Sequence, residues 1–148
     1  PVLVRALVDT MARLPGFPPD PLAAMAAALE PDGMLSAHCR FCYEMRLNRA
    51  RGYGALKAIL DILAAEEPLT LTQVSQRLGR TPGSTKDYLS WLEDVDLVAV
   101  DARKRYRFRD PVLRLWARLH CRPSPPSADD IAREVQDYAE RTLDALHP

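Results

Sequence analysis

The chain contains 148 residues, of which 47% are hydrophobic, and its 20 basic residues balance 20 acidic ones. This length and apolar content suit one domain, or two small subdomains that share a core. Dedicated DNA-binding domains are usually basic overall. With a formal net charge of zero, any nucleic-acid-binding site in this chain must rest on a local cluster of charge.

Targeting signals and membrane spans are not evident. No apolar run approaches the roughly 18 residues of a membrane-spanning helix, and the start P-V-L-V-R-A-L-V-D lacks the charged and apolar regions of a signal peptide. The three cysteines are an odd number and nothing points to secretion, so we expect reduced thiols in the cytoplasm. The chain begins at Pro1 rather than Met, which is compatible with a fragment of a longer protein.

The first 52 residues predict a helical subdomain. A helix over residues 2–14 is expected to bury an apolar stripe on one face. Asp20 and Pro21 predict the start of an alanine-rich helix that runs to Pro31, because Asp caps helices and Pro is tolerated at their first position. A third helix spans about residues 34–50. The predicted stripe of the first helix consists of Val4, Leu7, Val8, Met11 and Leu14.

Residues 53–120 predict a winged helix-turn-helix. A helix from Gly54 to Glu67 and a short strand at residues 69–71 come first, and we expect Thr72 to cap the next helix, which Gly79 closes. Thr81 and Pro82 then start a second helix after a tight turn, as in a helix-turn-helix. Two strands follow, at residues 97–101 and 105–109, with a basic tip between them, and Tyr106 and Phe108 are expected on the buried face. Asp110-Pro111 starts another helix.

Residues 121–148 predict a proline-rich connector and an acidic C-terminal helix. Ser127 and Asp130 form a predicted capping box. The apolar stripe of the helix comprises Ile131, Val135, Tyr138, Thr142 and Leu146. The predicted fold is therefore mainly α: a helical bundle (1–52), a winged helix-turn-helix with a small β-hairpin wing (53–120), and a connector with a C-terminal helix (121–148).

The second helix of a helix-turn-helix normally enters the major groove of DNA with its first residues. Its candidate DNA contacts here are Thr81, Ser84 and Lys86, with Asp87 and Ser90 also exposed. Acidic residues follow, and phosphates repel such a surface, so use of the fold for protein packing stays open. Trp91 falls beside the core stripe and is the candidate protein-interaction residue.

The predicted wing carries a second set of candidate DNA contacts. Five cations lie within seven residues, namely Arg103, Lys104, Arg105, Arg107 and Arg109. Such a strip can follow phosphates or enter a minor groove. Alternatively, these cations pair with Asp96, Asp101 and Asp110 or with the acidic last helix. A further basic set, at residues 40, 46, 49 and 51, is interpreted as a solvated helix face.

The cysteines and histidines are candidate ligands of a zinc site. Cys39 and Cys42 have the spacing of one half of such a site, but they fall inside a predicted helix, and the adjacent His120 and Cys121 diverge by about 100° on a helix. We therefore expect structural cysteines and no metal. The run G-R-T-P-G-S-T-K lacks the Gly-Lys-Ser/Thr ending of a phosphate-binding loop. No catalytic constellation is evident, so no enzyme activity is predicted.

Four segments of residues 53–119 together resemble a known family. They are Y-G-A-L-K-A-I-L-D-I-L-A, L-T-L-T-Q-V-S-Q-R-L-G, G-S-T-K-D-Y-L-S-W-L-E-D-V-D-L-V and R-Y-R-F-R-D-P-V-L-R-L-W-A-R-L. This region resembles the C-terminal half of archaeal-type P-loop ATPases, which are AAA-like, STAND-related proteins of archaea and bacteria. Residues 1–52 resemble, more weakly, the helical lid after the ATPase core.

The resemblance implies an upstream nucleotide-binding domain with Walker motifs, none of which lies in this chain. ATP and Mg²⁺ are then expected for the parent protein and no cofactor for these residues. The preferred interpretation is a non-catalytic region that binds double-stranded DNA through the wing or regulates its own ATPase domain, without contacting a membrane. The alternatives are a module that packs on its ATPase core or on another partner, and a free-standing winged-helix transcription regulator.

Overall fold

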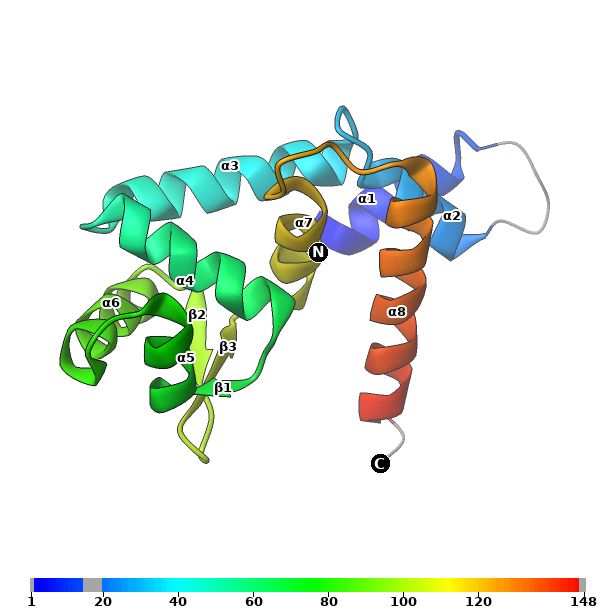
Figure 1. Ribbon diagram of the computed structural model, residues 1–148. Helices are drawn as coiled ribbons and strands as arrows, with labels where there is room; N and C mark the ends of the chain where they lie inside the picture. Colours follow the sequence, from blue (N-terminus) through cyan, green and yellow to red (C-terminus); the bar gives the residue numbers. More distant parts are fainter. Residues whose placement is uncertain (1, 15–19, 147–148) are drawn as a thin grey trace. The chain divides into compact units, whose positions relative to one another are not determined.

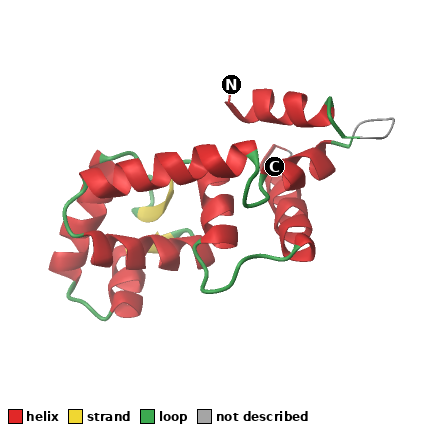
Figure 2. Cartoon of the chain, turned by 90° about the horizontal axis from the view of Figure 1, so that it is seen from above, coloured by secondary structure: helices red, strands yellow, loops and turns green. Residues whose placement is uncertain are grey.

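The computed structural model describes residues 2–14 and 20–146. Helix dominates these residues and the strands are short, as Figure 2 shows. None of the described helices combines the length and the apolarity that crossing a bilayer requires. The elements are, in chain order, α1 (Val2–Met11), α2 (Pro21–Ala28), α3 (Met34–Arg49), α4 (Tyr53–Ala65), β1 (Leu69–Thr70), α5 (Leu71–Leu78), α6 (Pro82–Asp94), β2 (Val98–Val100), β3 (Arg105–Phe108), α7 (Pro111–His120) and α8 (Ala128–Leu146).

The chain forms two compact units. The first unit combines the chain up to Arg40 with the chain from Leu119 onward, and the second unit comprises residues 41–118. This division differs from the predicted segments 1–52, 53–120 and 121–148. The predicted C-terminal segment belongs with the N-terminal helices because α8 packs against α2, a long-range contact that sequence order does not reveal.

The first unit is built around the alanine-rich α2. Asp20 caps this helix by accepting the backbone N–H of Leu22 at 2.9 Å, with Pro21 in the first turn, as predicted. Ala24, Met25, Ala28 and Leu29 are all buried. Small side chains allow α1 and α8 to approach α2 closely.

The predicted burial of the apolar stripe of α1 is wrong. Ala6 is the buried residue of this helix, whereas Val4 and Val8 are 63% and 59% exposed and Leu14 is also exposed. Periodicity identifies an apolar face but not the element that covers it. Here α1 packs against α2, and the buried residue of α1 is the small Ala6.

The predicted stripe of α8 is buried only in its first half. Ile131 and Val135 are buried, Tyr138 is half-buried and Thr142 is exposed, while the side chain of Leu146 lies outside the described residues. At about 1.5 Å per residue, the 19-residue α8 is more than twice as long as the 8-residue α2. The second half of α8 therefore extends past the helix that covers its first half. The predicted capping box at its start is confirmed, with Ser127 and Asp130 bonded reciprocally.

His120 ties the end of α7 to the end of α2. Its Nε2–H donates to the carbonyl of Leu29 at 2.8 Å, and the hydroxyl of the buried Ser36 lies 3.3 Å from the same nitrogen. Burial lowers the pKa of His120 below its ordinary value of 6.5, and the charges of Arg40 and Arg122 lower it further, against the opposing effect of the hydrogen bond to Leu29.

This depressed pKa predicts a pH dependence of stability. Because the folded chain disfavours the protonated imidazole, the contribution of His120 is complete above its ordinary pKa and is lost as the pH falls through the folded value. Urea titrations at about pH 7.5 and about pH 5.5 give the free energy of unfolding at each pH. We expect it to fall more between the higher and the lower pH in the unmodified chain than in His120→Gln. Gln can still donate to Leu29 but does not titrate. An equal fall in both proteins would contradict the assignment.

The second unit is a winged helix-turn-helix, as predicted. Helices α4, α5 and α6 pack together beside a three-stranded antiparallel sheet in the order β1-β3-β2 (Figure 1). Leu69 lies opposite Tyr106, and Val98 opposite Phe108. The core gathers side chains from the three helices, the hairpin and α7, namely Leu56, Ile59, Leu60, Leu63, Val74, Leu89, Leu92, Phe108, Leu113 and Trp116.

Two local predictions in this unit need correction. The residue that caps α5 is Thr70 rather than Thr72: Thr70 Oγ1 accepts the N–H of Gln73, and Gln73 Oε1 accepts the N–H of Thr70 at 2.9 Å. Only Thr70 has a Gln three residues later, which a capping box requires. Phe108 is buried as predicted, but Tyr106 is half-buried. Val100, opposite Tyr106, is 45% exposed, so this end of the hairpin is poorly covered.

Glu67 anchors the wing to the helices. Its Oε2 accepts the backbone N–H of Phe108 at 2.6 Å, and its Oε1 lies 3.3 Å from Arg114 Nε. Both charged side chains are only 13% exposed. Removing one partner of such a pair leaves the other charge in a poorly solvated position.

We expect Glu67→Ala to lower the free energy of unfolding by about 2–3 kcal/mol, because both the hydrogen bond and the ion pair are lost. Glu67→Gln keeps an acceptor for Phe108 and should lose less. The neighbouring Glu66 pairs with Arg77 in an exposed position, so Glu66→Ala is a matched control with little expected effect. Urea unfolding of the three variants measures this order, and equal losses for Glu66→Ala and Glu67→Ala would contradict it.

Candidate nucleic-acid interface

Helix α6 occupies the position of a recognition helix. Gly79, with φ of 66°, closes α5 and turns the chain toward α6, a backbone conformation that favours glycine. Thr81 caps α6 by accepting the N–H of Ser84, with Pro82 in the first turn, as predicted. Thr85 and Leu89 are buried, so the opposite side of the helix is presented to solvent.

Two of the three predicted contact residues of α6, Thr81 and Ser84, form hydrogen bonds with each other at the start of the helix. The hydroxyls of Thr81 and Ser84 lie 3.0 Å apart, and Ser84 Oγ also donates to the carbonyl of Thr81. Lys86 is exposed, as are Asp87 and Ser90. The described structure therefore presents Lys86 as the cation of the first turns of α6, while the role of all three residues in DNA binding stays a prediction.

Arg80 is a candidate that sequence analysis missed. It lies in the turn between α5 and α6, is exposed, and forms no ion pair among the described residues. The preceding cation, Arg77, is instead held by Glu66 with Nη2–Oε2 at 2.6 Å. The position of Arg80 directly before the cap of the recognition helix was the signal that could have identified it.

Asp101 organises the tip of the wing. Its Oδ1 accepts the backbone N–H groups of Arg103 and Arg105, each at 2.9 Å, and its Oδ2 lies 3.0 Å from Arg105 Nη2. These bonds, chiefly the backbone bond from Arg105, hold the pKa of Asp101 below its ordinary value. Lys104 adopts a positive φ of 56° at the tip, and the turn projects beyond the helices in the view of Figure 1.

The five predicted wing cations divide into two groups. Arg105 pairs with Asp101, and Arg109 lies 3.3 Å from Asp96, so pairing, the alternative raised by the sequence, holds for these two. Asp110 instead caps α7 by accepting the N–H of Val112 at 2.8 Å. The remaining three are exposed and form no ion pair among the described residues; they are Arg103, Lys104 and Arg107.

Trp91 is half-buried, as its position beside the core stripe predicted. Its ring meets the ring of Tyr88 edge-on at a centroid distance of 5.6 Å. A side chain at Gly52 would lie 3.6 Å from Trp91 and 3.7 Å from Tyr88, and Gly52 has φ of 88°. Trp91 thus finds neighbours within its own unit, and its contact with another protein stays a prediction.

The sequence also singled out the cysteines and a second basic set. Cys39 is buried, and Cys42 and Cys121 are half-buried. No group of three or more His, Cys, Asp or Glu residues that could hold a metal occurs in the described part of the chain. In the second basic set, Arg40, Arg49 and Arg51 are exposed, as a solvated face predicts. Arg46 is half-buried and donates to the carbonyl of Asp96.

Comparison with protein families identifies the same module. Residues 57–102 match the IclR helix-turn-helix domain, which runs from within α4 to the start of the wing turn. Searches of curated proteins and of solved structures found no match, and nothing found links the chain to P-loop ATPases. Residues 57–102 are therefore similar to the IclR helix-turn-helix domain, and the second unit that contains them has the fold of a winged helix-turn-helix.

Proposed function

We propose that the second unit is the DNA-binding module of a non-enzymatic transcription regulator. The observation that carries this proposal is the IclR-type match over α4, α5, α6 and β2. The placement of five exposed cations that form no ion pair among the described residues supports it. They lie at the start of the recognition helix and on the wing, the two parts of this fold that approach DNA, and comprise Arg80, Lys86, Arg103, Lys104 and Arg107.

The charge distribution favours phosphate contact over extensive base readout. Lys86 is followed by Asp87, and α6 ends in Glu93 and Asp94. A carboxylate near a phosphate costs binding energy, whereas each cation that neutralises a phosphate releases a counterion. In this proposal the wing and Arg80 provide most of the affinity for DNA. The first turn of α6 provides the contacts to base edges.

Fluorescence anisotropy with a labelled random-sequence duplex tests the proposal. We expect saturable binding that weakens steeply between about 50 mM and about 200 mM salt. Selection from a pool of randomised duplexes should then enrich a shared site, as a regulator requires. Absence of saturable duplex binding at the lower salt concentration would contradict the proposal.

A protein-interaction module is the second candidate. The acidic residues of α6 favour it, since phosphates would repel Asp87, Glu93 and Asp94. Attachment to a P-loop ATPase, with ATP and Mg²⁺ bound upstream, stays a prediction from resemblance. Sequencing the gene upstream of Pro1 tests it directly, because a Gly-Lys-Ser/Thr loop should be encoded there.

A further inference from the structure

Helix α3 is one continuous helix with apolar side chains on two opposite faces. Met34, Phe41 and Met45 are exposed, and Phe41 is 62% exposed. At about 100° per residue, Phe41 and Met45 lie within about 20° of a line drawn along the helix from Met34. The buried residues of α3 lie on the opposite side, namely Leu35, Ser36, Cys39, Tyr43 and Leu47. A helix with only one covered face normally carries polar residues on the other.

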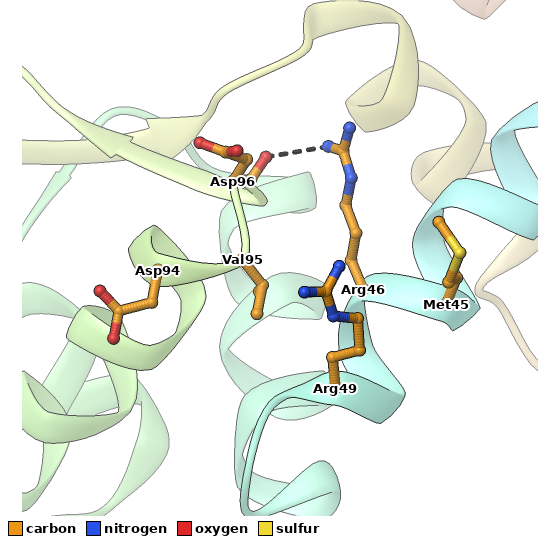
Figure 3. Close-up of a pocket in the computed structure, with 6 residues that line it drawn as sticks. All are labelled: Met45, Arg46, Arg49, Asp94, Val95 and Asp96. Carbon is orange, nitrogen blue, oxygen red and sulfur yellow. Dashed lines mark hydrogen bonds between the residues drawn. The ribbon is translucent and has the colours of Figure 1, made fainter.

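The described residues leave this apolar line open to solvent. In Figure 3 the side chain of Arg46 reaches from α3 to the carbonyl of Asp96, and in this view Met45 lies on the other side of Arg46 from Asp94. The line is bordered by further exposed positions that are small or polar, namely Ala37, His38 and Asn48. Apolar side chains that gather on an exposed face with a polar border mark a surface that contacts another protein.

Charges of opposite sign lie at the two ends of α3. Glu30 and Asp32 precede the helix, whereas Arg49 ends it and Arg51 follows it. All four are exposed and form no ion pair among the described residues. The face is therefore complementary to a copy of itself that runs in the opposite direction. A parallel copy would bring like charges together at both ends.

We propose that α3 is the contact surface between two copies of this chain, packed antiparallel about a twofold axis at Phe41. Such a contact uses the same face of both copies. Asp32 lies nine residues before Phe41 and Arg49 lies eight after it, so Asp32 of one copy meets Arg49 of the other. Glu30 and Arg51, eleven residues before and ten after, meet in the same way. The surface lies outside residues 57–102 and does not depend on DNA binding.

Sedimentation velocity of the full chain over a concentration series tests the association. A contact between two single helices lies at the low end of interface sizes. We therefore expect a dimer at about 200 µM that dissociates to a monomer by about 2 µM. A chain that stays monomeric over this whole range would overturn the proposal.

Phe41→Glu should raise the dissociation constant of the dimer about tenfold or more, because two apolar rings at the axis are replaced by two carboxylates that repel each other. Val4→Glu is the matched control, since Val4 is 63% exposed and lies on α1, and it should leave the constant unchanged. Far-UV circular dichroism verifies that both variants are folded. Equal weakening by the two substitutions would overturn the assignment to α3.

Reversal of the flanking charges tests whether the second copy is antiparallel. Exposed ion pairs contribute little when they are merely neutralised, whereas like charges that face each other repel. Glu30→Lys with Asp32→Lys should weaken the dimer, and so should Arg49→Glu with Arg51→Glu. All four substitutions together should restore the dissociation constant of the unmodified chain. Failure of the fourfold variant to associate better than either pair would overturn the antiparallel arrangement.

Discussion

Replacing Arg103 and Arg107 together by glutamine should lower the affinity for duplex DNA about tenfold or more. Both side chains are exposed and form no ion pair among the described residues, so each is available to replace a counterion at a phosphate. The slope of log affinity against log salt should therefore become shallower by about 2. Anisotropy titrations of the variant and of the unmodified chain over a salt series measure both quantities.

The matched control removes the same charge from the same unit. Arg49 lies near Asp94 at the C-terminal end of α6, and Arg51 is an exposed residue that follows α3. Replacing both by glutamine should change neither the affinity nor the slope. If the control pair weakened binding as much as the wing pair, general attraction by net charge would explain the result. The wing assignment would then be wrong.

Phe108→Ala should lower the free energy of unfolding of the second unit by about 3–5 kcal/mol. Phe108 is 2% exposed, ends β3 opposite Val98, and donates its N–H to Glu67. Truncation leaves a cavity where the wing meets the helices, and the loss includes the transfer energy of the ring as well as the cavity term. Urea unfolding followed by tryptophan fluorescence, with Trp116 buried in the same core, gives the value.

Two further substitutions serve as controls for the loss of stability in Phe108→Ala. Phe108→Leu keeps most of the volume and should cost about 1 kcal/mol. Val100→Ala alters the same hairpin at a side chain that is 45% exposed and should change the free energy by about 0.5 kcal/mol or less. A loss for Phe108→Ala no larger than that for Val100→Ala would show that the wing does not depend on this anchor.

Helix starts were the most predictable feature of the fold. Asp20, Thr81, Asp110 and Ser127 each cap the helix that the sequence assigned to them. A cap depends on residues within about one turn, so its evidence is complete in a short stretch of sequence. The same locality explains why the order of helices and strands in the winged unit was predicted correctly.

Burial depends on distant contacts and was predicted less well. The stripe of α1 has the right period, yet Val4 and Val8 are exposed, because only the position of α2 decides which face is covered. The predicted burial along α8 is wrong beyond Tyr138 for a related reason. The apolar spacing of α8 continues past the point where the shorter α2 ends. The sequence predicts Thr72 as a cap because it predicts a strand over residues 69–71, whereas β1 ends at Thr70.

The candidate interface shows the same limit. The sequence placed five cations on one hairpin, but it could not decide which of them are neutralised. Asp101 is close in sequence and its pairing with Arg105 was a stated alternative, whereas the pair of Arg109 with Asp96 depends on the turn after α6. Arg80 precedes Thr81, the cap of α6, and so lies outside the pattern that predicts the helix.

The most direct test of the account maps the DNA-contacting surface. In ¹H–¹⁵N correlation spectra of the labelled chain with a short duplex, we expect the largest shifts at residues 80–86 and 101–107, with residues 94–96 little changed. This is the result that a winged helix contacting DNA through the start of α6 and the wing predicts. Shifts absent from both segments, or largest on the acidic end of α6, would contradict it.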